Sequence, residues 1–147
     1  GMKNAPVQAI AEDLIEKRCA DIVVIKQGPQ GALVHDGRCV EQIPAYRSRS
    51  VWKIGSGDTF AAHFAFNWMI AGKSAADSAD AASRATAYYC QTRGFPTSDS
   101  LESFTPDAIV PSPAFCAGNK PTVYLAGPFF TLAQLWIVEQ RCDRCGS

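Results

Sequence analysis

The sequence lacks any long hydrophobic run. No stretch approaches the roughly 18 consecutive apolar residues that a membrane-spanning helix needs. The first residues also lack the succession of basic, apolar and small residues that is typical of a signal peptide. These absences predict a cytoplasmic protein without a membrane partner.

The sequence also has no excess of either charge. Its 14 lysine and arginine residues are balanced by 14 aspartate and glutamate residues. A balanced chain has no diffuse positive field that would attract nucleic acid, so nucleic acid is not an expected partner. Any phosphate group that this protein binds must therefore be held by local geometry.

The six cysteines lack the spacing of a disulfide framework. Cys142 and Cys145 form a C-x-x-C pair, a spacing used in redox and zinc sites, but no second pair or histidine lies near them. No metal site is therefore predicted. The other four stand among apolar neighbours, and most of them are expected to be buried thiols in a reducing compartment: Cys19, Cys39, Cys90 and Cys116.

Histidine is scarce, with two residues in the chain. His63 falls within an apolar helical pattern and is interpreted as a core residue, while His35 precedes a turn and is expected at the surface. No Ser-His-Asp set or pair of carboxylates stands out, so neither pattern of catalysis is indicated.

A chain of 147 residues can bury the core of one α/β domain but not of two. Prolines become frequent after Phe95 and interrupt any long regular element. The predicted organisation is a first domain over residues 2–96, a proline-rich linker over 97–121 with at most a short helix near Pro106, and the beginning of a further domain over 122–147.

Hydrophobic periodicity predicts the elements of the first domain. Apolar residues recur at helical spacing over residues 7–18, and residues 22–25 are a β-branched run that suits a strand covered on both faces. Residues 28–31 read as a tight turn. Residues 32–35 and 39–43 flank Asp36-Gly37, which is a strong signal for a hairpin.

Two helices are expected next. A glycine turn at residues 55–57 opens an apolar helix that ends at Gly72. A second, alanine-rich helix runs from Ser74 to about Gln91, with Ser74 and Asp77 at the spacing of a capping box.

The run Gly55-Ser56-Gly57-Asp58 stands at a helix start, which suits anion binding. Residues without side chains let the backbone approach a phosphate, and the free N–H groups of the first turn point at it. A carboxylate at the edge of such a pocket can accept the proton of a hydroxyl that attacks ATP. Asp58 is equally explained as a charge that stabilises the helix N-terminus.

Residues 24–34, then Gly55-Ser56-Gly57-Asp58-Thr59-Phe60, then the alanine-rich helix resemble in order and spacing the C-terminal half of ribokinase-like (PfkB) carbohydrate kinases. The resemblance covers about residues 9–96. It implies an α/β fold with a largely parallel sheet flanked by helices, followed by a short strand-turn-helix extension. It also implies phosphoryl transfer from ATP, with Mg²⁺, to a hydroxyl of a sugar or nucleoside.

The resemblance assigns roles to particular residues. Gly55, Ser56 and Gly57 would form the anion hole that holds phosphate, and Asp58 would be the catalytic base. Gly28 and Gly31 would lie beside the nucleotide, and the helix over residues 75–91 would form a wall of the adenine pocket.

Two features depart from the family pattern. Trp52-Lys53-Ile54 replaces an Asp-Thr-Thr-like run associated with activation by monovalent cations, so such activation is not expected. The larger N-terminal portion of the family, which supplies the sugar pocket, has no counterpart in these 147 residues, so the kinase is expected to be incomplete. A homo-oligomer is expected, and a non-catalytic oligomerising fragment is an alternative function.

A second resemblance is confined to residues 122–141. Val123 to Phe130 is similar to the first strand and loop of nucleoside 2-deoxyribosyltransferases. That likeness implies a nucleoside pocket lined by Gly127 and Phe129, and a role in nucleoside salvage as another alternative function. An ordinary strand-turn-helix with packed aromatic residues explains the same pattern.

Overall fold

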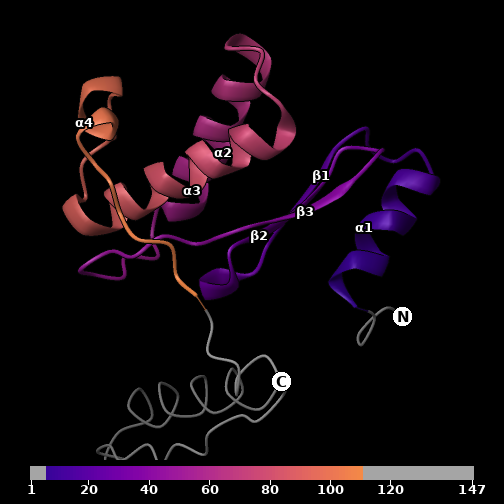
Figure 1. Ribbon diagram of the computed structural model, residues 1–147, viewed down its shortest axis with the longest axis horizontal. Helices are drawn as coiled ribbons and strands as arrows, with labels where there is room; N and C mark the ends of the chain where they lie inside the picture. The colour runs from indigo at the N-terminus through magenta and orange to yellow at the C-terminus, as the bar shows by residue number, and fades with distance from the viewer. Residues whose placement is uncertain (1–5, 111–147) are drawn as a thin grey trace, which may run out of the picture. The chain divides into compact units, whose positions relative to one another are not determined.

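The computed structural model describes residues 6–110, which form a helix, a sheet and a second group of helices (Figure 1). By its contacts the chain divides into the units Gly1–Pro111 and Ser112–Ser147. The elements of the described residues are α1 (Val7–Glu16), β1 (Val23–Lys26), a 3₁₀ helix (Gly28–Gln30), β2 (Ala32–His35), β3 (Val40–Ile43), α2 (Ser56–Ala65), a π-helical turn (Phe66–Ile70), α3 (Ala75–Thr92) and α4 (Ser98–Glu102).

The sheet has three strands in the order β1-β2-β3, and both neighbouring pairs are antiparallel. The predicted hairpin about Asp36-Gly37 is confirmed as β2 and β3. The prediction of a largely parallel sheet is wrong for the described strands. Residues 27–31 and 36–39 are the only chain between successive strands, and a parallel pair needs a crossover of a dozen or more residues.

Helices cover both faces of this sheet. In Figure 1, α1 lies on one side of the strands, and α2 and α3 lie on the other. The central strand β2 is buried along its whole length, and its side chains alternate between the faces. Leu33 packs in a cluster with Ala11 of α1, whereas Ala32 and Val34 pack with residues of α2 and α3. The central strand β2 is therefore covered on both faces, and β1, at the sheet edge, also packs on both faces, since Val23 belongs to the cluster with α1 and Val24 packs against the other.

Alanine lets α3 approach its neighbours closely. Ala79, Ala82 and Ala85 are each fully buried, and Ala79 and Ala82 belong to the cluster that contains Phe60 of α2. The predicted start of the helix is confirmed, because Ser74 is the N-cap and its hydroxyl accepts a hydrogen bond from the Asp77 amide at 3.0 Å. The face of α3 that carries these small residues therefore packs closely against both the sheet and α2.

Three local expectations were wrong. His35 is 9% exposed, because it lies on the covered strand β2, and its Nδ1 accepts a hydrogen bond from the Gly37 amide at 3.0 Å. Cys19 and Cys39 are exposed instead of buried, since both lie in connections outside the core. The short helix expected near Pro106 is α4, which begins earlier because Thr97 and Ser100 form a capping box.

The chain after α4 stays against the domain up to the last described residues. Tyr88 of α3 and Phe104 meet edge to face, with ring centroids 5.4 Å apart. The Arg47 amide donates to the Asp107 carbonyl at 2.9 Å, and the Ile109 amide donates to the Ala45 carbonyl at 2.7 Å. The described part of the proline-rich segment therefore packs on the chain that follows β3. None of the described helices is both long and apolar enough to cross a membrane.

Candidate functional site

The glycine turn that precedes α2 has a conformation that glycine favours. Gly55 has a φ angle of 80° and is the N-cap of α2. Its carbonyl accepts hydrogen bonds from the amide and from the hydroxyl of Thr59, both at 2.9 Å. Thr59 is buried. The turn is therefore tied to the first turn of the helix through Thr59, and Gly55 itself does not line the cavity described next.

The amides of this turn are only partly occupied. The Ser56 hydroxyl donates to the Lys53 carbonyl at 2.8 Å, and the Ser56 amide makes a long hydrogen bond of 3.4 Å to the same oxygen. The amides of Gly57 and Asp58 have no hydrogen-bond partner within residues 6–110. These two amides at the positive end of the helix dipole are the donors that an anion could use.

A cavity of about 430 Å³ brings the two predicted glycine turns together. Gly28 and Gly31 line it from the connection between β1 and β2, and Ser56 and Gly57 line it from the start of α2. Residues of α3 also line this cavity. The remaining lining residues are Lys26, Ala45, Tyr46, Ser48, Lys53, Phe60, Ser83, Thr86, Ala87 and Cys90.

Gly31 allows a close crossing of the backbone at this cavity. Its φ angle is 87°, and a Cβ atom placed on it would collide with the carbonyl of Ile43 and the backbone of Pro44 and Ala45. The chain that leaves β3 therefore passes directly against the turn that follows β1. Gly28 has a φ angle of 61° with open space around it, so its requirement for glycine is conformational only.

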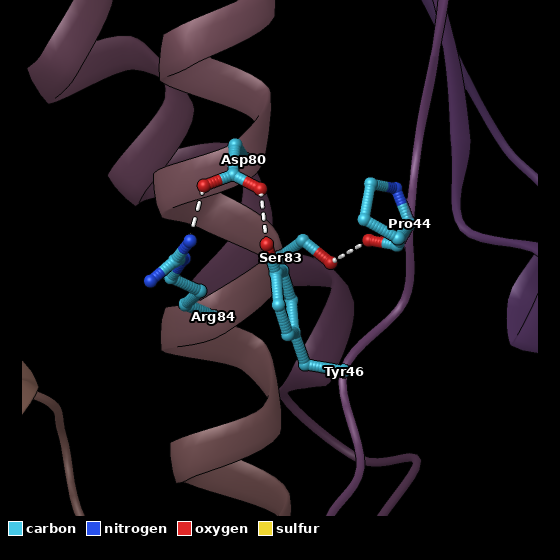
Figure 2. A network of polar contacts seen from close by, with 5 residues as sticks. All are labelled: Pro44, Tyr46, Asp80, Ser83 and Arg84. Carbon is cyan, nitrogen blue, oxygen red and sulfur yellow. Dashed lines mark hydrogen bonds and ion pairs between the residues drawn. The ribbon is translucent and has the colours of Figure 1, made fainter. Parts of the chain in front are cut away.

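A polar network joins α3 to the same crossing segment (Figure 2). The Tyr46 hydroxyl donates to Asp80 at 2.5 Å, and Nε of Arg84 donates to the other Asp80 oxygen at 2.9 Å. The Ser83 hydroxyl donates to the Pro44 carbonyl at 2.7 Å. Because Tyr46 and Ser83 both line the cavity, these bonds hold two of its walls at a fixed separation.

Asp58 lies on the first turn of α2 with its side chain exposed. It does not line the cavity, although the preceding two residues do. Asp58 thus shares the first turn of α2 with Ser56 and Gly57 but lies outside the cavity lining. Gly127, Phe129, Cys142 and Cys145 lie outside the described residues.

Sequence reasoning missed the position of Lys26. A Cβ atom on Gly57 would lie 3.0 Å from the Lys26 ammonium, so this cation stands at the N-terminus of α2. The sequence feature that could have indicated this position is a lysine at the end of an apolar strand, directly before a glycine turn. The Tyr89 hydroxyl donates to the Ile54 carbonyl at 3.0 Å.

A larger cavity of about 830 Å³ lies elsewhere, between α2, α3 and α4. His63 and Lys73 line it, and none of the predicted site residues does. Burial lowers the pKa of His63 below its usual value. Size alone favours this cavity, but the smaller one is the better candidate because it combines the free Gly57 amide, two lysines and residues of both glycine turns.

Comparisons with known proteins match the part of the chain that contains this cavity. Residues 3–101, more than half of the chain, match the family described as pfkB family carbohydrate kinase. A ribokinase from Lactococcus lactis is 35% identical over 57 residues, which are 39% of this chain and 19% of that protein.

Solved structures of sugar kinases have the same fold over this region. Ribokinase from Thermotoga maritima matches 67% of this chain and 34% of its own, with a TM-score of 0.60 and 23% identity. Fructokinase from Vibrio cholerae, in a form with bound fructose, ADP and calcium, matches 67% and 34%, with a TM-score of 0.57 and 18% identity. The chain spans about a third of these solved structures and about a fifth of the Lactococcus ribokinase.

Proposed function

Because the chain belongs to the pfkB family of carbohydrate kinases, we propose that it binds ATP in the 430 Å³ cavity and serves phosphoryl transfer to a sugar hydroxyl. The observation that carries this proposal is the meeting of Gly28 and Gly31 with Ser56 and Gly57 in one cavity. A nucleoside hydroxyl is the alternative acceptor.

The free amide of Gly57, which lines the cavity, is assigned to the phosphate groups. Phosphoryl transfer is catalysed mainly by positioning and by stabilisation of charge on the transferred group. Amides fixed by a helix supply such stabilisation without reorganisation at the moment of reaction. The ADP held by the Vibrio cholerae fructokinase, which shares the fold, supports a nucleotide as the ligand.

Asp58 is assigned the role of general base. A base must come within hydrogen-bond reach of the attacking hydroxyl, which lies outside the phosphate cavity in an in-line reaction. An exposed carboxylate one residue beyond the cavity lining fits that requirement. The sugar would then approach from the open side of α2.

No cluster of metal-binding side chains is found in the described part of the chain. Residues 6–110 contain no group of three or more histidine, cysteine, aspartate or glutamate side chains that could hold an ion. Magnesium commonly binds through substrate phosphates with one or two carboxylates. We therefore treat Mg²⁺ as part of Mg·ATP and assign no described residue to it.

The experiment is the melting temperature of the full chain with and without Mg·ATP. A ligand at a hundred times its dissociation constant stabilises by about 2.7 kcal/mol, which is a clear shift for a domain of this size. Deoxynucleosides are the comparison ligands, since a shift with them alone would favour the deoxyribosyltransferase-related alternative. The absence of any shift with Mg·ATP would remove the proposal.

A second candidate function is a non-catalytic fragment that oligomerises. The specific observation is a group of exposed apolar side chains on the π-helical turn, where Phe66 is 56%, Met69 69% and Ile70 74% exposed. Such patches mark interaction surfaces. Light scattering of the full chain should show an oligomer that Met69→Lys dissociates, together with no response to ATP.

A further inference from the structure

The π-helical turn that follows α2 lies on the cavity of about 830 Å³, because Phe66 and Asn67 both line it. The Ala71 amide donates to the Phe66 carbonyl at 3.0 Å, five residues back along the chain. Turns of this kind are rare and are found frequently at functional sites. The irregular helix geometry therefore directs attention to what this turn presents to the cavity.

Asn67 presents an unused hydrogen-bond acceptor there. Its side-chain nitrogen Nδ2 donates to the His63 carbonyl at 2.8 Å, which fixes the orientation of the amide because a carbonyl can only accept. The other amide atom, Oδ1, accepts no hydrogen bond from residues 6–110. Asn67 is only 8% exposed, and buried polar atoms normally have a partner.

The unpartnered Oδ1 atom is open to the cavity. In the described part of the chain, the Ser78 hydroxyl is the one unpartnered side-chain group that is fully enclosed by protein. The Oδ1 atom of Asn67 therefore still reaches open space, and the space that Asn67 lines is this cavity. A ligand that donates a hydrogen bond would satisfy it.

His63 supplies a second polar group to the same cavity, one helical turn before Asn67. Burial lowers the pKa of His63 below its usual value, so its ring is neutral near pH 7. A neutral imidazole has one nitrogen that donates and one that accepts. Neither ring nitrogen forms a hydrogen bond with another residue between 6 and 110, so both remain available to a ligand.

The rest of the lining is mainly apolar. Ala62 and Phe66 line the cavity on the α2 side, Ala81 lines it from α3, and Pro96 and Leu101 line it on the α4 side. Sites for small molecules commonly have this composition, with a few placed polar groups, and have volumes of roughly 300–1,000 Å³. Small side chains around an exposed aromatic ring suit a flat ligand.

The charges around this cavity balance. Arg84 is paired with Asp80 at 2.9 Å, and the remaining charged residues of the lining are Lys73 and Glu102, which have opposite signs. A ligand with a net charge would gain little from such a set. The lining therefore favours an uncharged ligand.

We infer that the 830 Å³ cavity is a second binding site, for a flat uncharged ring with an N–H donor beside an acceptor, as in a primary carboxamide or a nucleobase. Oδ1 of Asn67 accepts from the N–H group, and the His63 ring donates to the acceptor. This cavity shares no lining residue with the 430 Å³ cavity, so the inference is independent of the proposed binding of ATP.

The test is an NMR titration of the ¹⁵N-labelled full chain with benzamide. Benzamide should shift the side-chain amide signal of Asn67 and the backbone amide signal of His63, with a dissociation constant on the order of millimolar for a ligand of this size. N,N-dimethylbenzamide has the same ring without an N–H group and should bind roughly tenfold more weakly, the effect of one lost hydrogen bond. Benzoate, which is charged and has no donor, should also bind more weakly.

Two variants assign the contacts. His63→Phe retains a ring but removes both nitrogens, and Asn67→Ala removes the acceptor. Each should weaken benzamide binding by roughly tenfold and change the affinity for N,N-dimethylbenzamide by about twofold or less. Trp68→Phe is the matched control, since Trp68 belongs to the same π-helical turn but does not line the cavity; it should leave benzamide binding unchanged. Circular dichroism of each variant verifies the fold.

Three results would overturn the inference. One is the absence of benzamide-induced shifts at His63 and Asn67 in the wild-type protein. Another is benzoate or N,N-dimethylbenzamide binding as tightly as benzamide, which would exclude the stated ligand class. The third is an unchanged benzamide affinity in His63→Phe, which is informative even if Asn67→Ala fails to fold. None of these results affects the proposed function, which the response to Mg·ATP tests separately.

Discussion

The hydroxyl oxygen of Tyr89 lies 2.5 Å from the point that a Cβ atom on Gly55 would occupy. The same hydroxyl donates a hydrogen bond to the Ile54 carbonyl at 3.0 Å. The Tyr89 side chain, which comes from α3, thus occupies the space that a side chain at residue 55 would need. Its hydrogen bond to Ile54 fixes the turn that precedes α2. Residues far apart in sequence together define the start of α2.

Gly55→Ala should destabilise the protein for two separable reasons. A φ angle of 80° costs a residue with a Cβ atom about 1–2 kcal/mol, and the new methyl group would also collide with Tyr89. Gly72→Ala is the matched control, because Gly72 has a φ angle of 67° with nothing within 4 Å. Urea denaturation should show a larger loss for Gly55→Ala than for Gly72→Ala.

The double variant Gly55→Ala/Tyr89→Phe should recover part of that loss. Removal of the hydroxyl leaves Cζ of residue 89 as the nearest atom, at 3.1 Å. Equal losses for the two glycine variants, with no recovery in the double variant, would show that the contact between Tyr89 and the turn does not matter.

Tyr46→Phe should lower stability by about 1 kcal/mol near pH 8, because the hydrogen bond to Asp80 is lost. Burial, then the hydrogen bond and the charge of Asp80, raise the pKa of Tyr46 above its usual value of 10.0. The folded state therefore holds this proton more tightly than the unfolded state. The stabilisation is complete below about pH 10 and is lost as the pH rises through the folded pKa.

Urea denaturation between pH 8 and about pH 11 measures this effect. The difference in the free energy of unfolding between wild type and Tyr46→Phe should become smaller at the highest pH values. Tyr88→Phe is the control, since Tyr88 packs edge to face on Phe104 and its ring is retained. A difference that stays constant up to the highest pH contradicts the prediction.

His63→Gln should reduce the loss of stability in mild acid. Burial lowers the pKa of His63 below 6.5 in the folded state, so the unfolded state binds this proton more readily. Stability is then lost as the pH falls through about 6.5 toward the folded pKa. Chemical denaturation at pH 7 and pH 5 should show a smaller decrease for the variant than for wild type; equal decreases would exclude His63 as the source.

Asp58→Asn separates the two interpretations of this residue. Loss of the negative charge at the start of α2 should cost about 0.3–1 kcal/mol of stability, whichever interpretation holds. ATP affinity should not fall, because Asp58 does not line the cavity and carries a charge of the same sign as the ligand. Phosphoryl transfer, assayed with radiolabelled ATP and a panel of sugars, should disappear; transfer at the wild-type rate would exclude Asp58 as the base.

Local patterns predicted most elements correctly for identifiable reasons. Helical spacing of apolar residues gave the position of α1, and Asp36-Gly37 marked the hairpin of β2 and β3. Ser74 marked the start of α3. Each of these features depends on sterics and hydrogen bonds within a few residues.

The expectations that were wrong depended on distant parts of the chain. His35 was expected at the surface because it precedes a turn, but α1 and α3 enclose the two faces of its strand. The largely parallel sheet came from the family resemblance and not from the connections between the strands, which are too short for it.

The sequence by itself determined the elements, the glycine turn before α2 and the family resemblance, because each is a property of neighbouring residues. Only the tertiary structure decided that Gly28, Gly31, Ser56 and Gly57 share one cavity and that Lys26 reaches the start of α2. The register of β1 and the packing of α2 on the sheet set that position. Such long-range packing has no local sequence signature, since any exposed lysine looks the same in the sequence.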